Sequence, residues 1–337
     1  MQTSLVSFRS LIARRIGGAL VLVWLVVSLI FALIRLAPGD PATLLVPPSA
    51  SASDAARLRT ELGLDRPLAV QYVRWGANVL AGNLGESFTS RRPVIQVLRE
   101  AAPVSLYLGL TSLMLTFAVG VPIGMLQAAR RGRLIDRALT VCTTAIYAAP
   151  TFWLALALIA VFTYGAASLG LPAWMRLPAF AIRTPGLELG GAAAAWDLAR
   201  HSILPVLTLS VVGAAGVARY ARSGTADILP RDFVRTAWAK GSSPARVYGR
   251  HVLRSLLPQL VILFALSLPG VVAGSVFVES VFAWPGMGRA MLLAIQARDY
   301  PVVMGASVFY AAAVIVANLA ADLAMPLLDP RRRMVER

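Results

Sequence analysis

Six long apolar runs constrain the fold of this chain more than any other feature of its sequence. Each run has about 18 or more mostly hydrophobic residues, the length that an α-helix needs to cross a bilayer. Only 14% of the residues are charged, too few to cover a soluble core of this size. The runs cover residues 16–36, 104–129, 139–164, 203–220, 256–277 and 302–328. The sequence therefore predicts an all-α, polytopic membrane protein with six transmembrane helices.

The distribution of basic residues predicts the orientation of these spans. More than half of the 32 Lys+Arg residues lie in residues 1–15, 130–137, 219–254 and 329–337. Basic residues collect in cytoplasmic loops, so both termini are expected in the cytoplasm. The same rule accounts for the net charge of +16, which in a soluble protein would suggest nucleic acid. We expect the lipid bilayer, and no nucleic acid, as the surroundings of this chain.

The spans and loops divide the chain into four predicted parts. Residues 1–36 hold a short cytoplasmic segment and the first span, and residues 37–103 form a helical extracytoplasmic cap. Residues 104–328 form the membrane core with the other five spans. Residues 329–337 form a basic cytoplasmic tail.

The cap is expected to contain three helices. Ser53 is expected to cap a first helix that runs to Leu62, and Gly63 to end it. Pro93 suits the first turn of a third helix. The apolar face of the second helix is predicted from the spacing of Leu68, Tyr72, Trp75 and Val79.

Residues 222–254 are predicted to form a cytoplasmic elbow between the fourth and fifth spans. Residues 233–240 have helical composition, and Gly241 can adopt the left-handed conformation that ends a helix. Ser243 is expected to cap the next helix, with Pro244 in its first turn. A helix–glycine–helix elbow would be a rigid protrusion suited to docking a soluble protein, whereas the alternative is an ordinary solvated basic loop.

The elbow carries the first resemblance to a known family. Residues 232–258 read DFVRTAWAKGSSPARVYGRHVLRSLLP, which resembles the EAA-type loop of binding-protein-dependent ABC import permeases. Within that group it is similar to the dipeptide, oligopeptide and nickel branch, from which it departs at Phe233, Trp238 and Ser255. Further similar fragments are LGLDRPLAVQYVRW (62–75), GNLGESFTSRRPV (82–94), ESVFAWPGMGRAM (279–291), RDYPVV (298–303) and LDPRRR (328–333).

The resemblance implies a permease subunit of a type I ABC importer in a bacterial inner membrane. Its partners would be a second homologous permease subunit, two ABC ATPase subunits and an extracytoplasmic substrate-binding protein. The cargo implied is di- or oligopeptides, with nickel chelates, glutathione or oligosaccharides as alternatives. The identity of the cargo, of the ATPases and of the second permease stays open.

Two groups of functional residues follow from the resemblance. Coupling to the ATPases would use the elbow residues Asp232, Phe233, Arg235, Ala237, Lys240, Gly241, Pro244 and His251. The binding protein, or a gate beneath it, would be met by Glu279, Trp284, Pro285, Gly286 and Gly288. Taken alone, the second group could be an interfacial aromatic turn. It could also dip into the membrane under protein cover.

Asn318 and Asp322 in the sixth span are candidates for the transport pathway. An acidic residue inside a membrane span is costly and suggests a function. The other explanation is a hydrogen bond to a neighbouring span or to a partner subunit. A proton-coupled secondary transporter, with Asp322 in the relay, is one rival to the importer; a membrane scaffold that does not transport is the other.

The sequence lacks the usual motifs of catalysis and of metal binding. A single cysteine, Cys142, and two histidines, His201 and His251, provide no metal-binding cluster. The motifs G-x-x-x-x-G-K-[ST], G-x-S-x-G and H-E-x-x-H are absent. We therefore predict a transport subunit without catalytic residues, with ATP and Mg²⁺ bound by the partner ATPases.

Overall fold

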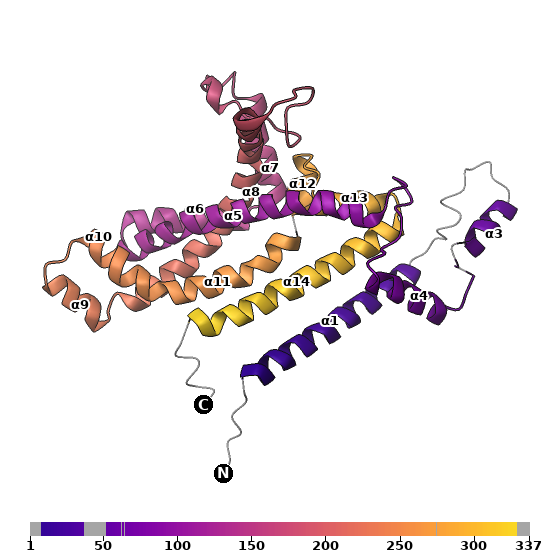
Figure 1. Cartoon of the computed structure of the whole chain (residues 1–337). Helices are drawn as coiled ribbons and strands as arrows, with labels where there is room; N and C mark the ends of the chain where they lie inside the picture. Colours follow the sequence, from indigo (N-terminus) through magenta and orange to yellow (C-terminus); the bar gives the residue numbers. More distant parts are fainter. Residues whose placement is uncertain (1–7, 37–51, 62, 64, 274, 329–337) are drawn as a thin grey trace, which may run out of the picture.

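The structure, a computed structural model, describes residues 8–36, 52–61, 63, 65–273 and 275–328. The predicted basic tail, 329–337, lies outside these residues. The described part is helical apart from turns, connecting segments and one isolated β-bridge between Glu86 and Pro93. Its all-α class agrees with the prediction (Figure 1).

The α-helices are α1 (Phe8–Leu36), α3 (Ala52–Glu61), α4 (Leu68–Leu80), α5 (Val94–Ala129), α6 (Leu134–Ala148), α7 (Thr151–Ile159), α8 (Gly191–Ile228), α9 (Asp232–Ala239), α10 (Pro244–Arg246), α11 (Leu253–Ala273), α12 (Val276–Val281), α13 (Met287–Gln296) and α14 (Tyr300–Leu328). The π-helical segments are η1 (Ala160–Tyr164) and η3 (Val247–Val252), and η2 (Ala173–Met175) is a 3₁₀ turn.

Five stretches of helix within the described residues are long and apolar enough to cross a membrane. They lie in α1, α5, α8, the stretch from α10 to α11, and α14. The predicted third span is not one helix, because α6 and α7–η1 meet at an angle of 102°. Ala149 before Pro150 is extended, with ψ of 133°, as expected for a residue that precedes proline. Counting this bent pair as one span gives the six that the sequence predicts.

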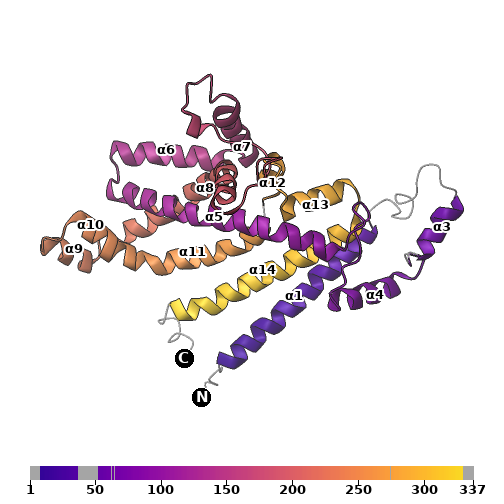
Figure 2. The same ribbon diagram turned by 45° about the horizontal axis from the view of Figure 1, so that its top comes forward.

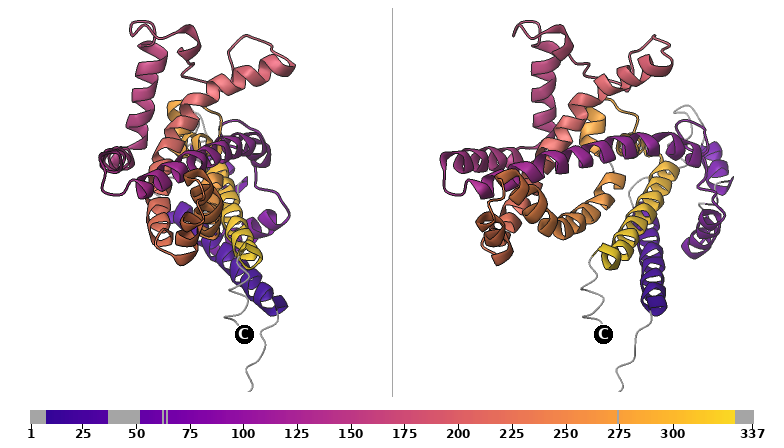
Figure 3. Two further views of the ribbon diagram at one scale, coloured as in Figure 1. Left: turned by 90° about the vertical axis from the view of Figure 1, so that its left-hand side faces the viewer. Right: turned by 60° about the vertical axis from the view of Figure 1, so that its left-hand side comes forward.

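Two helices are longer than predicted. The third cap helix is not separate, because α5 runs without a break from Val94 through Pro103 into the second span. The fourth span begins at Gly191 rather than near residue 203, so a stretch assigned to a loop is helical. Figure 3 shows that α7 and the first part of α8 project away from the bundle.

The contact between α5 and α8 is the most extensive in the molecule. Two glycines on α5 bring the backbones together. A Cβ atom on Gly120 would lie 2.7 Å from the carbonyl oxygen of Ala214, and one on Gly124 would lie 2.2 Å from that of Ala218. Small residues four apart allow membrane helices to approach this closely. The helix pair forms the centre of the bundle around which α6 and α11 pack (Figure 2).

The cap helix α4 leans on the first span. Tyr72 and Trp75 place their rings against Phe31 of α1, with both centroid separations at 5.3 Å. The hydroxyl groups of Tyr72 and Ser28 are 2.6 Å apart. Tyr72 and Trp75 of the predicted apolar face therefore pack as expected, whereas Leu68 of that face is 56% exposed. The predicted cap of the preceding helix is wrong, because α3 begins at Ala52 and Ser53 lies inside it.

Candidate functional site

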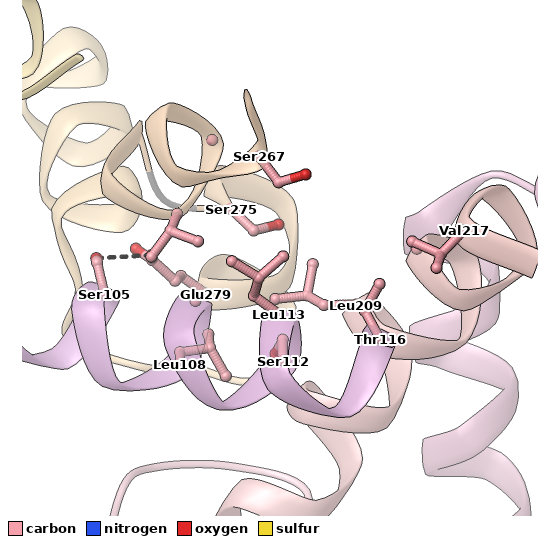
Figure 4. A pocket seen from close by; sticks show the side chains of 14 residues that line it. Ser105, Leu108, Ser112, Leu113, Thr116, Leu209, Val217, Ser267, Ser275 and Glu279 are labelled. Carbon is pink, nitrogen blue, oxygen red and sulfur yellow. Dashed lines mark hydrogen bonds between the residues drawn. The ribbon is translucent and has the colours of Figure 1, made fainter. Parts of the chain in front are cut away.

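A cavity of about 470 Å³ opens in the membrane part of the chain, among α5, α8, α11 and α12 (Figure 4). Its wall combines apolar side chains with hydroxyl groups and a single carboxylate. The lining residues are Ser105, Leu108, Gly109, Ser112, Leu113, Thr116, Leu209, Gly213, Val217, Ser267, Gly270, Val271, Ser275 and Glu279. Such a wall can contact both the polar backbone and the apolar side chains of a small solute.

The carboxylate at one end of the cavity belongs to Glu279, whose side chain is fully buried. The Ser105 hydroxyl donates a hydrogen bond of 2.8 Å to Oε1, and the Arg289 backbone N–H donates one of 3.0 Å to Oε2. Ser105 also accepts a 2.8 Å bond from the backbone N–H of Met287. The carboxylate thus satisfies the Arg289 amide, and Ser105 the Met287 amide, at the start of α13, where the helix dipole favours a negative charge.

The turn between α12 and α13 is packed inside the chain. Trp284 is 1% exposed, and its ring stacks on Tyr107 at 6.1 Å. Gly286 and Gly288 are buried beside the Glu279 carboxylate, and only Pro285 of the predicted contact residues is exposed. The reading of this turn as an exposed interfacial aromatic segment is wrong. Of these residues, only Pro285 offers exposed surface, and the others are buried.

A second buried acid, Asp299, joins two sequence fragments that lie about two hundred residues apart. Its carboxylate accepts hydrogen bonds from the Ser87 hydroxyl at 2.6 Å and from the backbone N–H groups of Phe88 and Thr89 at 3.1 Å. This fixes the 82–94 segment, which precedes α5, to the turn before α14. The sequence predicted no role for Asp299, which occurs in the fragment RDYPVV. Its position just after an apolar stretch was the one signal that it could be buried.

The elbow has the predicted backbone. Gly241 has φ of +74° and its N–H donates to the carbonyl of Trp238, which ends α9. Pro244 occupies the first turn of α10. The prediction for Ser243 is wrong in one respect, since it stands at the N-cap position but its side chain makes no capping hydrogen bond.

The elbow packs one face on the membrane helices and exposes the other. Val234 is completely buried in a cluster with Val247, Val252 and Leu256. Among the predicted coupling residues, Asp232, Phe233, Arg235, Lys240, Gly241 and Pro244 are exposed and His251 is half-buried. Ala237 is buried in the same cluster, so it supports the elbow instead of offering surface. Trp238 stands 42% exposed beside the ring of Tyr248.

An ion pair lies close to the elbow. Arg222 near the end of α8 donates from Nε and Nη2 to the two carboxylate oxygens of Asp136, at 2.9 and 3.0 Å. The N–H of Gly132 donates to the same carboxylate at 3.0 Å. The pair joins the start of α6 to the helix that leads into the elbow. Neither Arg222 nor this role of Asp136 is predicted from the sequence, where the one available signal is an acid and a base near the ends of two spans on the same side of the membrane.

Of the two pathway candidates on α14, Asn318 is not among the residues that line the cavity. Asn318 is exposed. Asp322 lies on the same helix, but its side chain is outside the described residues. Ser105 and Ser112 do line the cavity and were missed, although serines inside an apolar run are a recognisable signal for polar contacts in a membrane. Among the described residues, no group of three His, Cys, Asp or Glu side chains is placed to hold a metal ion.

Comparisons with known proteins cover almost the whole chain. Residues 120–334 match the family described as binding-protein-dependent transport system inner membrane component, and residues 8–109 match the N-terminal family of the same systems. A probable peptide ABC transporter permease of Sinorhizobium fredii is 36% identical over 96% of this chain and 98% of its own. The di/tripeptide transport system permease DppB of Pseudomonas aeruginosa is 37% identical over the same shares.

The fold has a counterpart among solved structures. An inward-facing structure of the MetNI methionine ABC transporter matches 70% of this chain and 97% of its own chain, with a TM-score of 0.50 and 18% sequence identity. This similarity supports the arrangement of helices, and the two family matches cover the spans, the cap and the elbow alike. The chain therefore belongs to the family of inner membrane components of binding-protein-dependent transport systems, as its resemblance to ABC import permeases predicted.

Proposed function

We propose that the chain is a permease subunit of an ATP-driven importer of peptides. The observation that carries this proposal is the 37% identity to a di/tripeptide permease along 96% of the chain. The cavity supports it, because its hydroxyl groups suit peptide bonds and its apolar side chains suit varied cargo side chains. Nickel chelates, glutathione and oligosaccharides are the alternative cargoes.

The working unit comprises this chain, a second homologous permease, two ABC ATPases and an extracytoplasmic binding protein. The cavity is one wall of the pathway, and the second permease supplies the facing wall. ATP and Mg²⁺ are bound by the ATPases, and this chain holds no cofactor and no catalytic residue. The elbow lies at the cytoplasmic end, together with both termini. At the opposite end, Pro285 and the 82–94 segment, which Asp299 holds by hydrogen bonds, face the binding protein.

Coupling runs through the exposed face of the elbow. The side chains of Phe233, Arg235 and Lys240 enter a groove of one ATPase, and the buried Val234 ties α9 to the base of α11. Closure of the two ATPases around ATP displaces the elbow, and α8 and α11, which flank it, carry the displacement into the membrane. A proton-coupled transporter is a weaker candidate, since Asn318 is not among the residues that line the cavity and the acid in the cavity is Glu279.

The test is peptide-stimulated ATP hydrolysis by the reconstituted complex in liposomes, with this chain in its native form or as Gly241→Asp. A Cβ at Gly241 would meet no atom within 4 Å, so the variant is expected to insert and fold. It adds a charge and a side chain to the face that meets the ATPase, and we expect peptide stimulation to be lost.

Gly186→Asp is the matched control, because Gly186 has φ of +76° and equally open surroundings but lies in the 165–190 connection. It should retain stimulation. Loss in both variants would point to backbone strain, and normal stimulation in Gly241→Asp would remove the elbow from the coupling route. A complex that hydrolyses ATP in response to a nickel chelate or a sugar, and to no peptide, would contradict the proposed cargo.

A further inference from the structure

We propose that the Glu279 end of the cavity binds the ammonium group of the cargo during its passage. The nature of the cargo rests on the proposed function, since a peptide with a free N-terminus carries such a group. The chemistry of the site rests on the cavity itself. Glu279 is the one ionisable residue among the fourteen that line it, so the cavity carries a negative charge and no lining residue offsets it.

The carboxylate has no cation of its own. None of the ion pairs in the described part of the chain involves Glu279. The nearest basic side chain along the sequence, Arg289, turns its guanidinium to the carbonyl of Ala283, to which Nη1 donates at 2.9 Å. A fully buried acid without a cation is unfavourable within a membrane and marks a functional position.

The chain holds this carboxylate in a fixed orientation without using up its acceptors. A carboxylate can accept about four hydrogen bonds. Ser105 donates one to Oε1 and the N–H of Arg289 donates one to Oε2, so about two acceptor sites stay free. A Cβ at Gly286 would lie 2.5 Å from the carboxyl carbon, and one at Gly288 would lie 3.0 Å from Oε2. Both glycines are thus required for Glu279 to lie where it does, in the wall of the cavity.

A second polar group on the same wall, the Ser112 hydroxyl, can form a hydrogen bond with a ligand. The Ser112 side chain lines the cavity and is 4% exposed, and its hydroxyl has no hydrogen-bond partner within the described structure. Ser112 follows Ser105 by seven residues, which is two turns, so both face the same side of α5 (Figure 4). A buried hydroxyl without a partner is unfavourable, and a cargo group that bonds to it removes that cost.

The set of groups selects an ammonium ion over a metal ion. An ammonium donates three hydrogen bonds, which a carboxylate and hydroxyl groups accept. A divalent cation needs more carboxylate or carbonyl ligands than this wall offers. A volume of about 470 Å³ also suits a solute of dipeptide size. One charge with few hydrogen bonds holds the cargo weakly, as passage requires.

The experiment measures the charge preference of thiol modification at Ser112→Cys in the assembled complex in liposomes. The background carries Cys142→Ser, which removes the one native cysteine. We compare the rates with cationic 2-aminoethyl methanethiosulfonate and neutral methyl methanethiosulfonate. Free cysteine in the same buffer gives the reference ratio. We expect the ratio at position 112 to exceed the reference by about tenfold, because the nearby carboxylate attracts the cation.

Two further measurements complete the test. Glu279→Gln should bring the ratio at position 112 down to the reference, and Glu279→Asp, which keeps the charge, should preserve most of the preference. With Glu279 intact, alanyl-alanine should slow the modification more than N-acetyl-alanyl-alanine does. This comparison needs no change at Glu279, so it stands even where Glu279→Gln fails to assemble.

A ratio equal to the reference with Glu279 intact, or equal protection by the two peptides, would overturn the inference. Either result can occur in a complex that still shows peptide-stimulated ATP hydrolysis, so failure of the ammonium site is distinct from failure of the proposed function. A complex without that hydrolysis that keeps the tenfold preference would support a cation site for a different cargo amine.

Discussion

Single residues set the closest approach of the two central helices. Gly120 and Gly124 of α5 lie one turn apart against Ala214 and Ala218 of α8, where a side chain would meet backbone carbonyl oxygen. The sequence G-x-x-x-G inside an apolar run is a known sign of close helix packing, so this contact could have been predicted. The identity of the helix that packs on these glycines, α8, could not be predicted, because the motif does not indicate which of the other spans will face it.

Replacing Gly124 with alanine should destabilise the chain. The added Cβ would lie 2.2 Å from the carbonyl oxygen of Ala218, so α5 and α8 must separate, at a cost of about 1–3 kcal/mol. We expect a lower thermal unfolding midpoint of the purified complex in detergent. The control is Gly216→Ala on α8, where the new atom would be 3.5 Å from the ring of Tyr147, an ordinary contact. Equal midpoints for the two variants would contradict the assignment.

The residues around Glu279 show where prediction from sequence ends. Glu279, Trp284, Gly286 and Gly288 were identified as a functional group from one short fragment. Their partner Ser105 is 174 residues away, and only the packing of α5 on α13 brings it to the carboxylate. Trp284 shows the same limit, since an aromatic residue near a span end can lie at the membrane interface or in a core, and the local sequence is compatible with both.

At the scale of elements, the elbow was the most predictable part of the chain and the third span the least. Gly241 and Pro244 determine their own backbone conformations, so their places in a helix–turn–helix could be predicted directly. The third span was predicted as one helix because its apolar content continues through Ala149 and Pro150. Hydropathy does not reveal the break between the two helices. Pro150 does indicate it, since a proline disfavours a helical conformation of the residue before it.

The two faces of α9 should respond differently to substitution. Phe233 and Trp238 are 40% and 42% exposed, so the double variant Phe233→Ala, Trp238→Ala should leave the thermal midpoint of the isolated chain nearly unchanged. We expect it to weaken co-purification of the ATPase, because exposed aromatic residues supply much of the energy of protein interfaces.

Val234→Ala, on the buried face of α9, is the control for the double variant on the exposed face. Val234 is fully buried, so its truncation should lower the stability of the chain by roughly 1–2 kcal/mol while leaving the exposed face of α9 in place. The thermal midpoint of the chain and the amount of ATPase that co-purifies with it, measured on both variants, distinguish a role in stability from a role in docking. An ATPase yield unaffected by loss of both aromatic side chains would contradict docking through this face.

For the whole molecule, the number of spans and their orientation follow from apolar length and loop charge. Both are properties of the chain taken alone; the number of spans agrees with the structure, and the orientation stays a prediction. The cavity could not, because its wall comes from four helices, α5, α8, α11 and α12, whose lining residues are mostly small or apolar. None of them, apart from Glu279, differs in type from residues that face lipid or core elsewhere in the chain.

The orientation can be tested with two single cysteines in a Cys142→Ser background. Ser90, four residues before α5, and Ser243, immediately before α10, are both exposed. The start of α5 and α10 lie toward opposite ends of the bundle (Figure 1). In spheroplasts, a membrane-impermeant maleimide should label Ser90→Cys at once and Ser243→Cys only after the membrane is permeabilised. Immediate labelling of both positions, or the reverse order, would contradict a cytoplasmic elbow.

The long stretch of α8 beyond its one internal proline has a mechanical consequence. Between Pro205 and the end of the helix at Ile228 there is no further proline, and this stretch carries Leu209, Gly213 and Val217 of the cavity wall. Leu209 lies 19 residues before Ile228, the end of the helix, which gives a lever arm of roughly 28 Å. Each degree of tilt about the elbow therefore shifts the cavity wall by about 0.5 Å, and a tilt of about ten degrees moves it by about 5 Å, comparable to the width of a peptide chain.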